Sequence, residues 1–268
     1  MTTQSPGLFI AFEGGDGAGK STQTAELAGA LEARGLKVLR TREPGGTPIG
    51  EKLRSLVLDH GHGHIDAHTE ALIFAASRAA HASQVIRPAL ERGELVLTDR
   101  YIDSSVAYQG AGRDLGTDAV REIHEWATAG LLPDLTVLLD VDPAVGRLRR
   151  TAGDAAEDRL ESEADEFHAR IRTAFLDLAA ARPEKYLILA AHQPVDALSA
   201  RILERVESLL ALSGSVTAGP SGTTFGASPP SSPSCARRPR AKGSTTPGFS
   251  RARPVPAAPT RRRHLPRP

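Results

Sequence analysis

The stretch "FIAFEGGDGAGKST" at residues 9–22 decides the fold of this chain. Its apolar start is typical of a buried strand, and its second half has the phosphate-loop pattern of glycine, four residues and Gly-Lys-Ser/Thr. Glycines let backbone N–H groups converge on phosphate, and a helix that begins at about residue 19 adds its positive end. We therefore predict a nucleoside triphosphate site. Its residues are Gly14, Gly15, Asp16, Gly17, Ala18, Gly19, Lys20, Ser21 and Thr22.

Three side chains of this loop have expected roles. Lys20 should reach the β- and γ-phosphates, and Ser21 should supply a hydroxyl to Mg²⁺. Asp16 is unusual, because a carboxylate beside triphosphate is repelled unless a cation or a bound acceptor lies between them. We expect it to organise Mg²⁺ or its water between a donor and an acceptor phosphate. The alternative is an aspartate that points outward from the loop.

Further strands and helices follow along the chain. Apolar runs predict buried strands at residues 8–12, 37–41, 94–98, 135–141 and 186–190. Helical spacing occupies residues 20–34, 65–91, 162–181 and 195–212. The alternation predicts an α/β fold of the phosphate-loop type, a five-stranded parallel sheet with helices on both faces. Trp126, in a predicted helix over 117–130, is expected in the core.

A second anion site is expected where the strand at 94–98 ends. Asp99 and Arg100 follow this strand, and ligands of open α/β sheets bind beyond the carboxyl ends of the strands. Asp99 is suited to hold Mg²⁺ through water. Arg100 is suited to grip a second phosphate with its planar fork, which a simple hydrolase would not need. The alternative is a structural ion pair between Arg100 and Asp99.

Two further segments carry side chains that suit a nucleotide. Phe74 and Arg78 lie four residues apart on one helix face, where they could stack on a base and bond its edge, although core packing and solvation are the simpler readings. Residues 148–163 carry Arg149, Arg150 and Arg159 around a stretch that looks poor in helix. We expect a lid that brings arginines to the transferred phosphoryl group, and the alternative is a mobile charged loop.

The C-terminal tail differs from the rest of the 268 residues. The chain has 33 basic and 32 acidic residues; ten of the basic ones and none of the acidic ones follow residue 212. Residues 213–268 are rich in Pro, Ser, Gly and Arg and should be disordered, whereas 1–212 form the folded domain. The tail is either a dispensable extension or a basic arm that binds polyanions weakly.

Cellular location is expected to be cytoplasmic. The only cysteine is Cys235, which excludes an intramolecular disulfide and favours a reducing compartment. The N-terminus lacks the features of a signal peptide, and no apolar run approaches the ~20 residues that span a bilayer.

Several motifs together resemble the bacterial thymidylate kinase family. They are, in order, "FEGGDGAGKST", "TREPGGTPIGEKLRSLVL", "TEALIFAASR", "DRYIDSSVAYQG" and "LLPDLTVLLDV". "DRLE" at 158–161, followed by "FHARI", is similar to the family's lid and the helix after it. The phosphate loop alone is generic, whereas "REPGG" together with "DRYIDSSVAYQG" is specific. The resemblance covers residues 7 to 212 and does not account for the tail.

The resemblance implies a role for particular residues. Phe74 would stack on thymine, Arg78 would bond its edge, and Arg54 and Arg100 would hold the acceptor phosphate. The implied dTMP site comprises Glu43, Arg54, Phe74, Arg78, Arg100, Ser105, Tyr108 and Gln109. The implied catalytic residues are Asp16, Lys20, Arg100, Arg149 and Arg159, and the implied metal site comprises Ser21, Asp16 and Asp99.

The implied reaction moves a phosphoryl group from ATP, with Mg²⁺, to dTMP. The family also implies a homodimer. Two other functions stay open at this point. A different nucleoside monophosphate kinase would keep the fold and change the base site. A phosphate-loop ATPase with a nucleic-acid-binding tail would leave Arg100 and the "SSVAYQG" stretch without a role.

Overall fold

The computed structural model describes residues 7–152 and 157–215, and within them five strands form one parallel sheet in the order β2-β3-β1-β4-β5. The strands are β1 (Phe9–Glu13), β2 (Val38–Arg42), β3 (Leu95–Asp99), β4 (Leu135–Asp140) and β5 (Tyr186–Ala190). The expected α/β fold is confirmed, and each strand ends within one residue of the apolar run that predicted it. Most of the tail, with its expected disorder and polyanion binding, lies outside the described residues.

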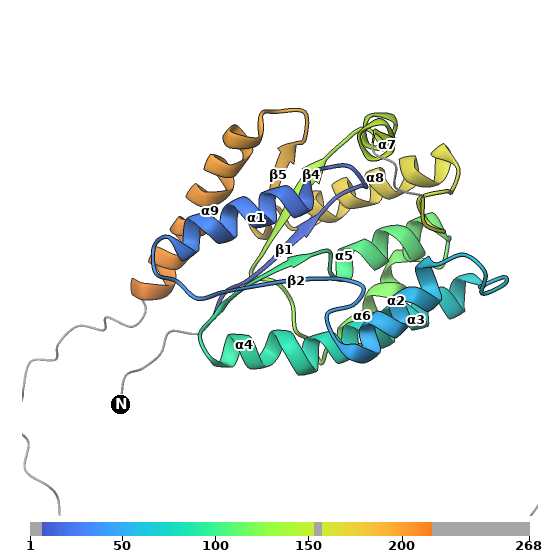
Figure 1. The fold of residues 1–268 in the computed structure, drawn as a ribbon, viewed down its shortest axis with the longest axis horizontal. Helices are drawn as coiled ribbons and strands as arrows, with labels where there is room; N and C mark the ends of the chain where they lie inside the picture. The colour runs from blue at the N-terminus through green and yellow to red at the C-terminus, as the bar shows by residue number, and fades with distance from the viewer. Residues whose placement is uncertain (1–6, 153–156, 216–268) are drawn as a thin grey trace, which may run out of the picture. The chain divides into compact units, whose positions relative to one another are not determined.

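Helices connect the strands and cover both faces of the sheet (Figure 1). They are α1 (Lys20–Glu32), α2 (Pro48–Leu58), α3 (Ala67–His81), π-helical η1 (Ala82–Ile86), α4 (Arg87–Glu91), α5 (Ile102–Ser105), π-helical η2 (Val106–Gly112), α6 (Thr117–Ala127), α7 (Pro143–Thr151), α8 (Asp165–Ala181), the 3₁₀ turn η3 (Pro183–Lys185) and α9 (Val195–Ser215). The predicted helix over 65–91 is thus three consecutive segments. Among the described helices, none combines the length and apolar character needed to cross a membrane.

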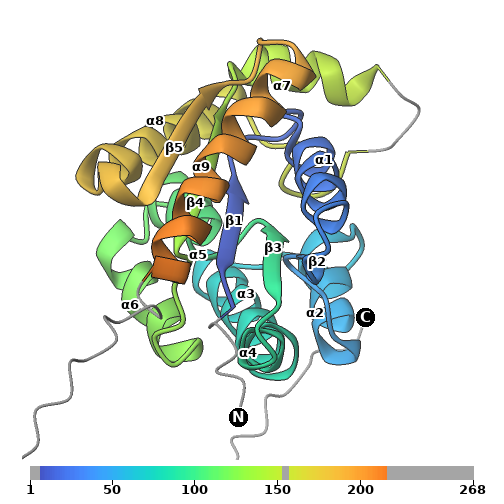
Figure 2. The same cartoon turned by 90° about the vertical axis from the view of Figure 1, so that its left-hand side faces the viewer.

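The alternating side chains of β1 divide the core between the two faces of the sheet. Ile10 and Phe12 pack with α1 and α9 on one face, whereas Phe9 and Ala11 pack with η1, α4 and α5 on the other. Figure 1 shows α1 and α9 above the strands and α4 below them, and in Figure 2 α9 crosses in front of the strands while α3 and α4 lie below. Because residues of a strand point alternately to opposite faces, this central strand can be apolar throughout.

A third apolar cluster lies beside the carboxyl ends of the strands. It joins α2, α3, η2 and α8 through Val57, Phe74, Tyr108, Phe167 and Ile171. The cluster places α3 and η2 against each other next to the phosphate loop. These are the two segments that carry the residues expected to contact a base.

One expectation about a side chain is wrong, and one about a segment holds only in part. Trp126 is 84% exposed, although it was expected in the core. Helix α6 buries Val120 and His124 instead, and a residue two positions after a buried one lies about 200° around the helix, on the opposite face. The stretch after residue 148 is also less irregular than expected, because α7 continues to Thr151 and makes Arg149 and Arg150 helical.

Helix α9 should stabilise the fold mainly through the side chains that it buries in the core. Ile202 is 0% exposed in the core and Leu212, on the same helix, is 64% exposed. We expect Ile202→Ala to lower the free energy of unfolding by about 2–5 kcal/mol, because it leaves a cavity in the apolar cluster that α9 shares with α1 and the sheet. The matched control Leu212→Ala should change it by less than about 0.5 kcal/mol. Urea denaturation of both variants measures this, and equal losses would contradict the assignment.

Candidate functional site

The phosphate loop, residues 14–19, runs from the end of β1 to the start of α1 and lies against α7. Gly17 has a φ of 75°, and a Cβ placed there would lie 2.2 Å from the Gly146 carbonyl oxygen. A Cβ on Gly146 would in turn lie 2.3 Å from the Asp16 carbonyl oxygen. These two glycines therefore allow the loop and α7 to approach closely. Lys20 folds back over the loop, and its Nζ donates to the carbonyl oxygens of Gly14 at 3.1 Å and Gly15 at 2.9 Å.

Ser21 and Asp99 meet at the mouth of this loop. Parallel pairing of β1 with β3 sets Phe12 opposite Asp99, which brings the end of β3 beside the loop. The Ser21 hydroxyl donates to Asp99 Oδ2 at 2.6 Å. A hydroxyl beside a carboxylate is the oxygen-rich donor set that Mg²⁺ prefers, completed by water and substrate phosphates. The two residues therefore fit a magnesium ion, although the described residues contain no cluster of three or more His, Cys, Asp or Glu side chains.

Arg100 follows β3 in a backbone conformation that non-glycine residues rarely adopt, with a φ of 71°. Its backbone N–H donates to the Phe12 carbonyl oxygen at 2.9 Å. Its Nη2 donates to Asp16 Oδ1 at 2.5 Å and to the Tyr108 hydroxyl at 3.2 Å, and its Nη1 donates to the Ser104 hydroxyl at 3.0 Å. Such a conformation costs about 1–3 kcal/mol and persists only where its surroundings fix it. Arg100 thus pairs with Asp16 rather than with Asp99.

Asp16 points inward, into a ring of donors. Besides the bond from Arg100, its Oδ2 accepts a hydrogen bond from the Tyr108 hydroxyl at 2.8 Å. Burial alone would raise the pKa of Asp16, but the charges of Arg100 and Lys20, with the Tyr108 bond, hold the pKa well below its usual range. The carboxylate is therefore ionised across the physiological pH range. The cations that were expected to compensate it are side chains of the chain itself.

Glu13, the last residue of β1, supports the turn that carries Arg100. Its carboxylate accepts from the Tyr101 N–H at 2.8 Å, from the Ser104 N–H at 3.2 Å and from the Ser104 hydroxyl at 2.6 Å. Burial, and then the charge of Asp103, raise the pKa of Glu13 to about 7 against the opposing effect of these hydrogen bonds. Sequence reasoning missed this role, because the glutamate looks like part of a strand.

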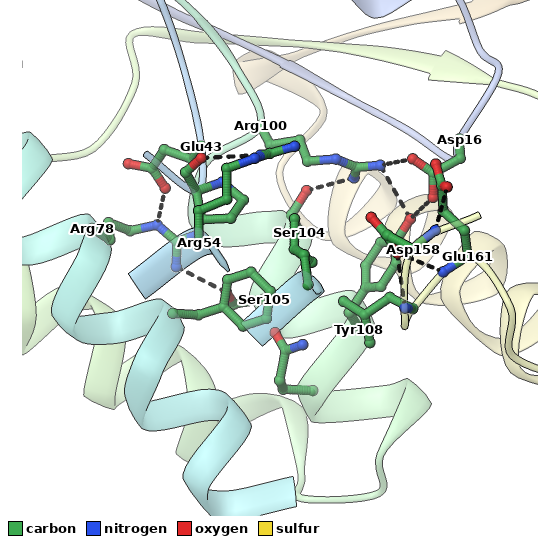
Figure 3. Close-up of a pocket in the computed structure, with 15 residues that line it drawn as sticks. Asp16, Glu43, Arg54, Arg78, Arg100, Ser104, Ser105, Tyr108, Asp158 and Glu161 are labelled. Carbon is green, nitrogen blue, oxygen red and sulfur yellow. Dashed lines mark hydrogen bonds and ion pairs between the residues drawn. The ribbon is translucent and has the colours of Figure 1, made fainter. Parts of the chain in front are cut away.

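Two cavities meet at Asp16 and Arg100. One lies over the phosphate loop and includes Lys20, Ser21 and Asp99, and we call it the donor cavity. The other, the acceptor cavity, extends toward α3 and η2 (Figure 3). Both are also lined by Glu43, Arg54 and Glu161. The acceptor cavity contains all eight residues predicted for the monophosphate: Glu43, Arg54, Phe74, Arg78, Arg100, Ser105, Tyr108 and Gln109.

Arg78 is 2% exposed, and its guanidinium group contacts four hydrogen-bond partners of the protein. Its Nε donates to Glu43 Oε2 at 2.5 Å, and Nη2 donates to the Tyr101 carbonyl oxygen at 2.8 Å. Its Nη1 contacts the Ser105 hydroxyl at 2.9 Å and His124 Nδ1 at 2.5 Å. Burial, and then the positive charge of Arg78, lower the pKa of His124 to about 2, so this imidazole is neutral and can accept from Arg78.

The three arginines of the predicted lid occupy different places. Arg149 lines the donor cavity, where its Nη1 donates to the Ala191 carbonyl oxygen at 3.0 Å. Arg150 lines the same cavity and pairs with Glu157. Arg159 lines neither cavity and pairs instead with Glu70 on α3 at 2.5 Å. The structure therefore does not bring Arg159 to the phosphate cavities, and its catalytic role stays a prediction.

Several cavity residues were missed by sequence reasoning. Asp158 and Glu161 line the acceptor cavity beside Asp16 (Figure 3). The Asp158 carboxylate accepts from the backbone N–H groups of Leu160 at 2.8 Å and Glu161 at 2.9 Å, which makes this short turn compact. The "DRLE" motif was the available signal, but it did not say which of its side chains face the cavity.

Comparison with known proteins gives one consistent result. A family model described as "Thymidylate kinase" matches residues 12–202 of the chain. A protein named "Thymidylate kinase" from Clavibacter michiganensis subsp. michiganensis is 54% identical over 209 residues, which are 78% of this chain and 99% of the relative. Proteins of the same name from Leifsonia xyli subsp. xyli and Deinococcus radiodurans are 55% and 54% identical over 77% and 74% of this chain and 98% and 95% of their own lengths.

Proposed function

Because this chain belongs to the thymidylate kinase family, we propose that it transfers the γ-phosphoryl group of ATP to the 5′-phosphate of dTMP, which yields dTDP and ADP in nucleotide biosynthesis. The family match confirms the resemblance drawn from the motifs. It also separates this chain from a phosphate-loop protein that only hydrolyses ATP. The observation that carries the proposal is the meeting of the donor and acceptor cavities at Asp16 and Arg100.

The donor side would hold the triphosphate of ATP. Backbone N–H groups of residues 14–19 and the Lys20 ammonium suit the β- and γ-phosphates. Ser21 and Asp99 would hold Mg²⁺, which supplies charge neutralisation on the phosphate oxygens when it is bound. Asp16 was predicted as a third metal residue. Its two carboxylate oxygens bond Arg100 and Tyr108, which favours a role in holding Arg100 between the two phosphates.

The acceptor side would hold the monophosphate at one end and the base at the other. Arg54 and Arg100 line the end next to the donor cavity and suit the phosphate of dTMP. Phe74, on α3, offers a ring on which thymine can stack. Arg78 can donate to a thymine carbonyl, since one of its five N–H groups has no assigned partner in the described part of the chain. Gln109 can accept from thymine N3–H.

Catalysis would depend on positioning and charge rather than on a protein nucleophile. The second pKa of a phosphate monoester is about 6, so the acceptor phosphate is already largely ionised at neutral pH. No strong general base is therefore needed to remove a proton from it. Arg100 lies between the two cavities, and Arg149 and Arg150 line the donor side. These guanidinium groups can stabilise the charge that develops on the transferred phosphoryl group. Exclusion of water by the residues around 157–161 would favour transfer over hydrolysis.

We also propose that two copies of the chain form a homodimer through α2, α3 and α6. These helices contact one another in sequence, α2 with α3 and α3 with α6. Each carries exposed large apolar side chains, which are Ile49, Leu56, Leu72, Ile123 and Trp126. Such side chains on neighbouring helices favour an isologous contact, in which both subunits use the same surface. Trp126, which is 84% exposed in the single chain, would be buried in the pair.

The choice of base is the first test of the proposal. Thymine presents an N3–H donor beside carbonyl acceptors, whereas cytosine presents an N3 acceptor and an amino donor. Unpaired buried polar groups cost about 1–3 kcal/mol each, so we expect kcat/KM for dTMP to exceed that for dCMP by about 100-fold or more. Uracil lacks only the methyl group of thymine, so kcat/KM for dUMP should fall below that for dTMP by an amount equivalent to about 1–3 kcal/mol. Assays with ATP, Mg²⁺ and dTMP, dUMP, dCMP, dGMP or dAMP measure this, and a preference for dCMP or a purine would overturn it.

Arg100 should matter for every monophosphate. Arg100→Ala removes charged hydrogen bonds to the acceptor phosphate, and we expect a loss of at least about 2 kcal/mol in kcat/KM for dTMP. Arg201→Ala, on the exposed face of α9, is the matched control and should keep the activity of the unaltered chain. Turnover by Arg100→Ala close to that of the control would show that the phosphate clamp is misassigned.

If the chain is a dimer through this surface, one substitution there should halve the mass of the particle in solution. Trp126→Asp should shift the chain from dimer to monomer, because it places a charge in the proposed apolar contact. Leu148→Asp, which alters another exposed apolar side chain on α7, outside the proposed contact, should leave the dimer intact. Light scattering after size-exclusion chromatography measures both masses. A monomeric unaltered chain would contradict the homodimer.

A further inference from the structure

Glu70 is a buried carboxylate that none of the proposed steps uses. It lies on α3, is 0% exposed, and is surrounded by donors from three other side chains. Its Oε1 accepts from Gln109 Nε2 at 2.9 Å and from Arg113 Nε at 3.2 Å. Its Oε2 accepts from Arg113 Nη2 at 3.2 Å and from Arg159 Nη2 at 2.5 Å. Two guanidinium groups therefore balance its charge, and one side-chain amide depends on it for a partner.

The contact with Glu70 fixes which end of the Gln109 amide faces the acceptor cavity. An ionised carboxylate can only accept hydrogen bonds, so the NH₂ group of Gln109 must turn toward Glu70. The amide oxygen then points the other way. Gln109 is buried and lines the acceptor cavity with Phe74 and Arg78. The base consequently meets an acceptor at this position. Rotation of the amide by half a turn would set its oxygen against the carboxylate, which is unfavourable.

We propose that Glu70 is a positioning residue that sets the choice of base by holding the Gln109 amide with its oxygen toward N3 of the pyrimidine. This inference rests on the proposed function and extends it to a residue outside the substrate contacts. Thymine and uracil offer an N3–H to that oxygen. Cytosine offers a lone pair, and two acceptors then face each other. With Glu70 in place, the amide cannot turn to accommodate cytosine.

Arg113 and Arg159 position the Glu70 carboxylate. Arg113 follows η2 and also pairs with Glu163 at 2.6 Å, while Arg159 donates through Nε to the Val57 carbonyl oxygen at 2.8 Å. Both arginines are thus anchored independently of Glu70, and their hydrogen bonds hold the carboxylate in one place. A neutral side chain of the same shape could donate as well as accept. It would leave the orientation of the Gln109 amide undetermined.

The decisive variant is Glu70→Gln, which keeps the shape of the side chain and removes its acceptor-only character. The readout is the ratio of kcat/KM for dTMP to kcat/KM for dCMP. We expect this ratio to fall by about 10-fold or more, because the Gln109 amide can then present either end to the base. Glu204→Gln, the same exchange at an exposed position on α9, is the matched control and should leave the ratio unchanged. Equal losses for both substrates, with the ratio kept, would show a purely structural role and overturn the proposal.

A second substitution should restore the choice. In the double variant Glu70→Gln with Gln109→Glu, the carboxylate lies at position 109 and is an acceptor in either orientation, while position 70 donates to it. We expect the preference for dTMP to return to within about 5-fold of the unaltered chain, a difference of less than about 1 kcal/mol. If Glu70→Gln alone unfolds below the assay temperature, the dTMP preference of the double variant tests the proposal instead. A folded double variant that uses dCMP as well as dTMP overturns the proposal.

The same assays separate this inference from the proposed function. An unaltered chain that phosphorylates dTMP in preference to dCMP supports the proposed function whatever the variants do. With that preference present, an unchanged ratio in Glu70→Gln overturns only the role of Glu70. An unaltered chain that phosphorylates no monophosphate, or that prefers dCMP, overturns both.

Discussion

The ion pair between Arg100 and Asp16 is the contact on which the arrangement of the site depends. It joins the turn after β3 to the loop after β1, so it connects the two strand ends at which the donor and acceptor cavities meet. Arg100 adopts its left-handed backbone conformation at this point, and the Phe12 carbonyl, Ser104, Tyr108 and Asp16 hold it there. The cost of the conformation is offset by these bonds, and the three from the side chain aim the guanidinium group at the junction. A charge that the end of an inner strand holds in place would need little reorganisation during phosphoryl transfer.

The carboxylates around the site divide into two kinds. Asp99, beside Ser21, faces the donor cavity and is available to a metal ion. Asp16, Glu43 and Glu70 instead accept from arginines of the site, and each fixes the direction in which a donor points. A buried carboxylate of this kind costs desolvation energy and is retained where its charge is paired and hydrogen-bonded. Their common effect is that the arginines of the proposed anion and base contacts are ordered by the protein itself, which reduces the entropy cost of binding a ligand.

The segment predicted as a lid, residues 148–163, places its three arginines at two different parts of the site. Arg149 and Arg150 come from α7 and line the donor cavity, whereas Arg159 returns to α3 and pairs with Glu70. The three arginines are equivalent in a linear reading, since nothing in the spacing separates them. Their separation in space follows from α7, which ends after Thr151, and from the turn at residues 158–161 that Asp158 stabilises.

The sequence by itself determined the parallel sheet, the phosphate loop and the family, because these depend on local patterns: apolar runs, glycine spacing and motifs at fixed separations. Through the family's motifs it also predicted side chains, such as Phe74 and Gln109, that the structure places around the acceptor cavity. It misplaced Trp126, since a tryptophan is apolar wherever it lies and only the packing of Val120 and His124 decides which face of α6 is buried. It was silent on Glu70. The contact of this residue with Gln109 joins positions 39 residues apart, and only the tertiary structure, by packing α3 against η2, brings the carboxylate to the amide whose direction it fixes.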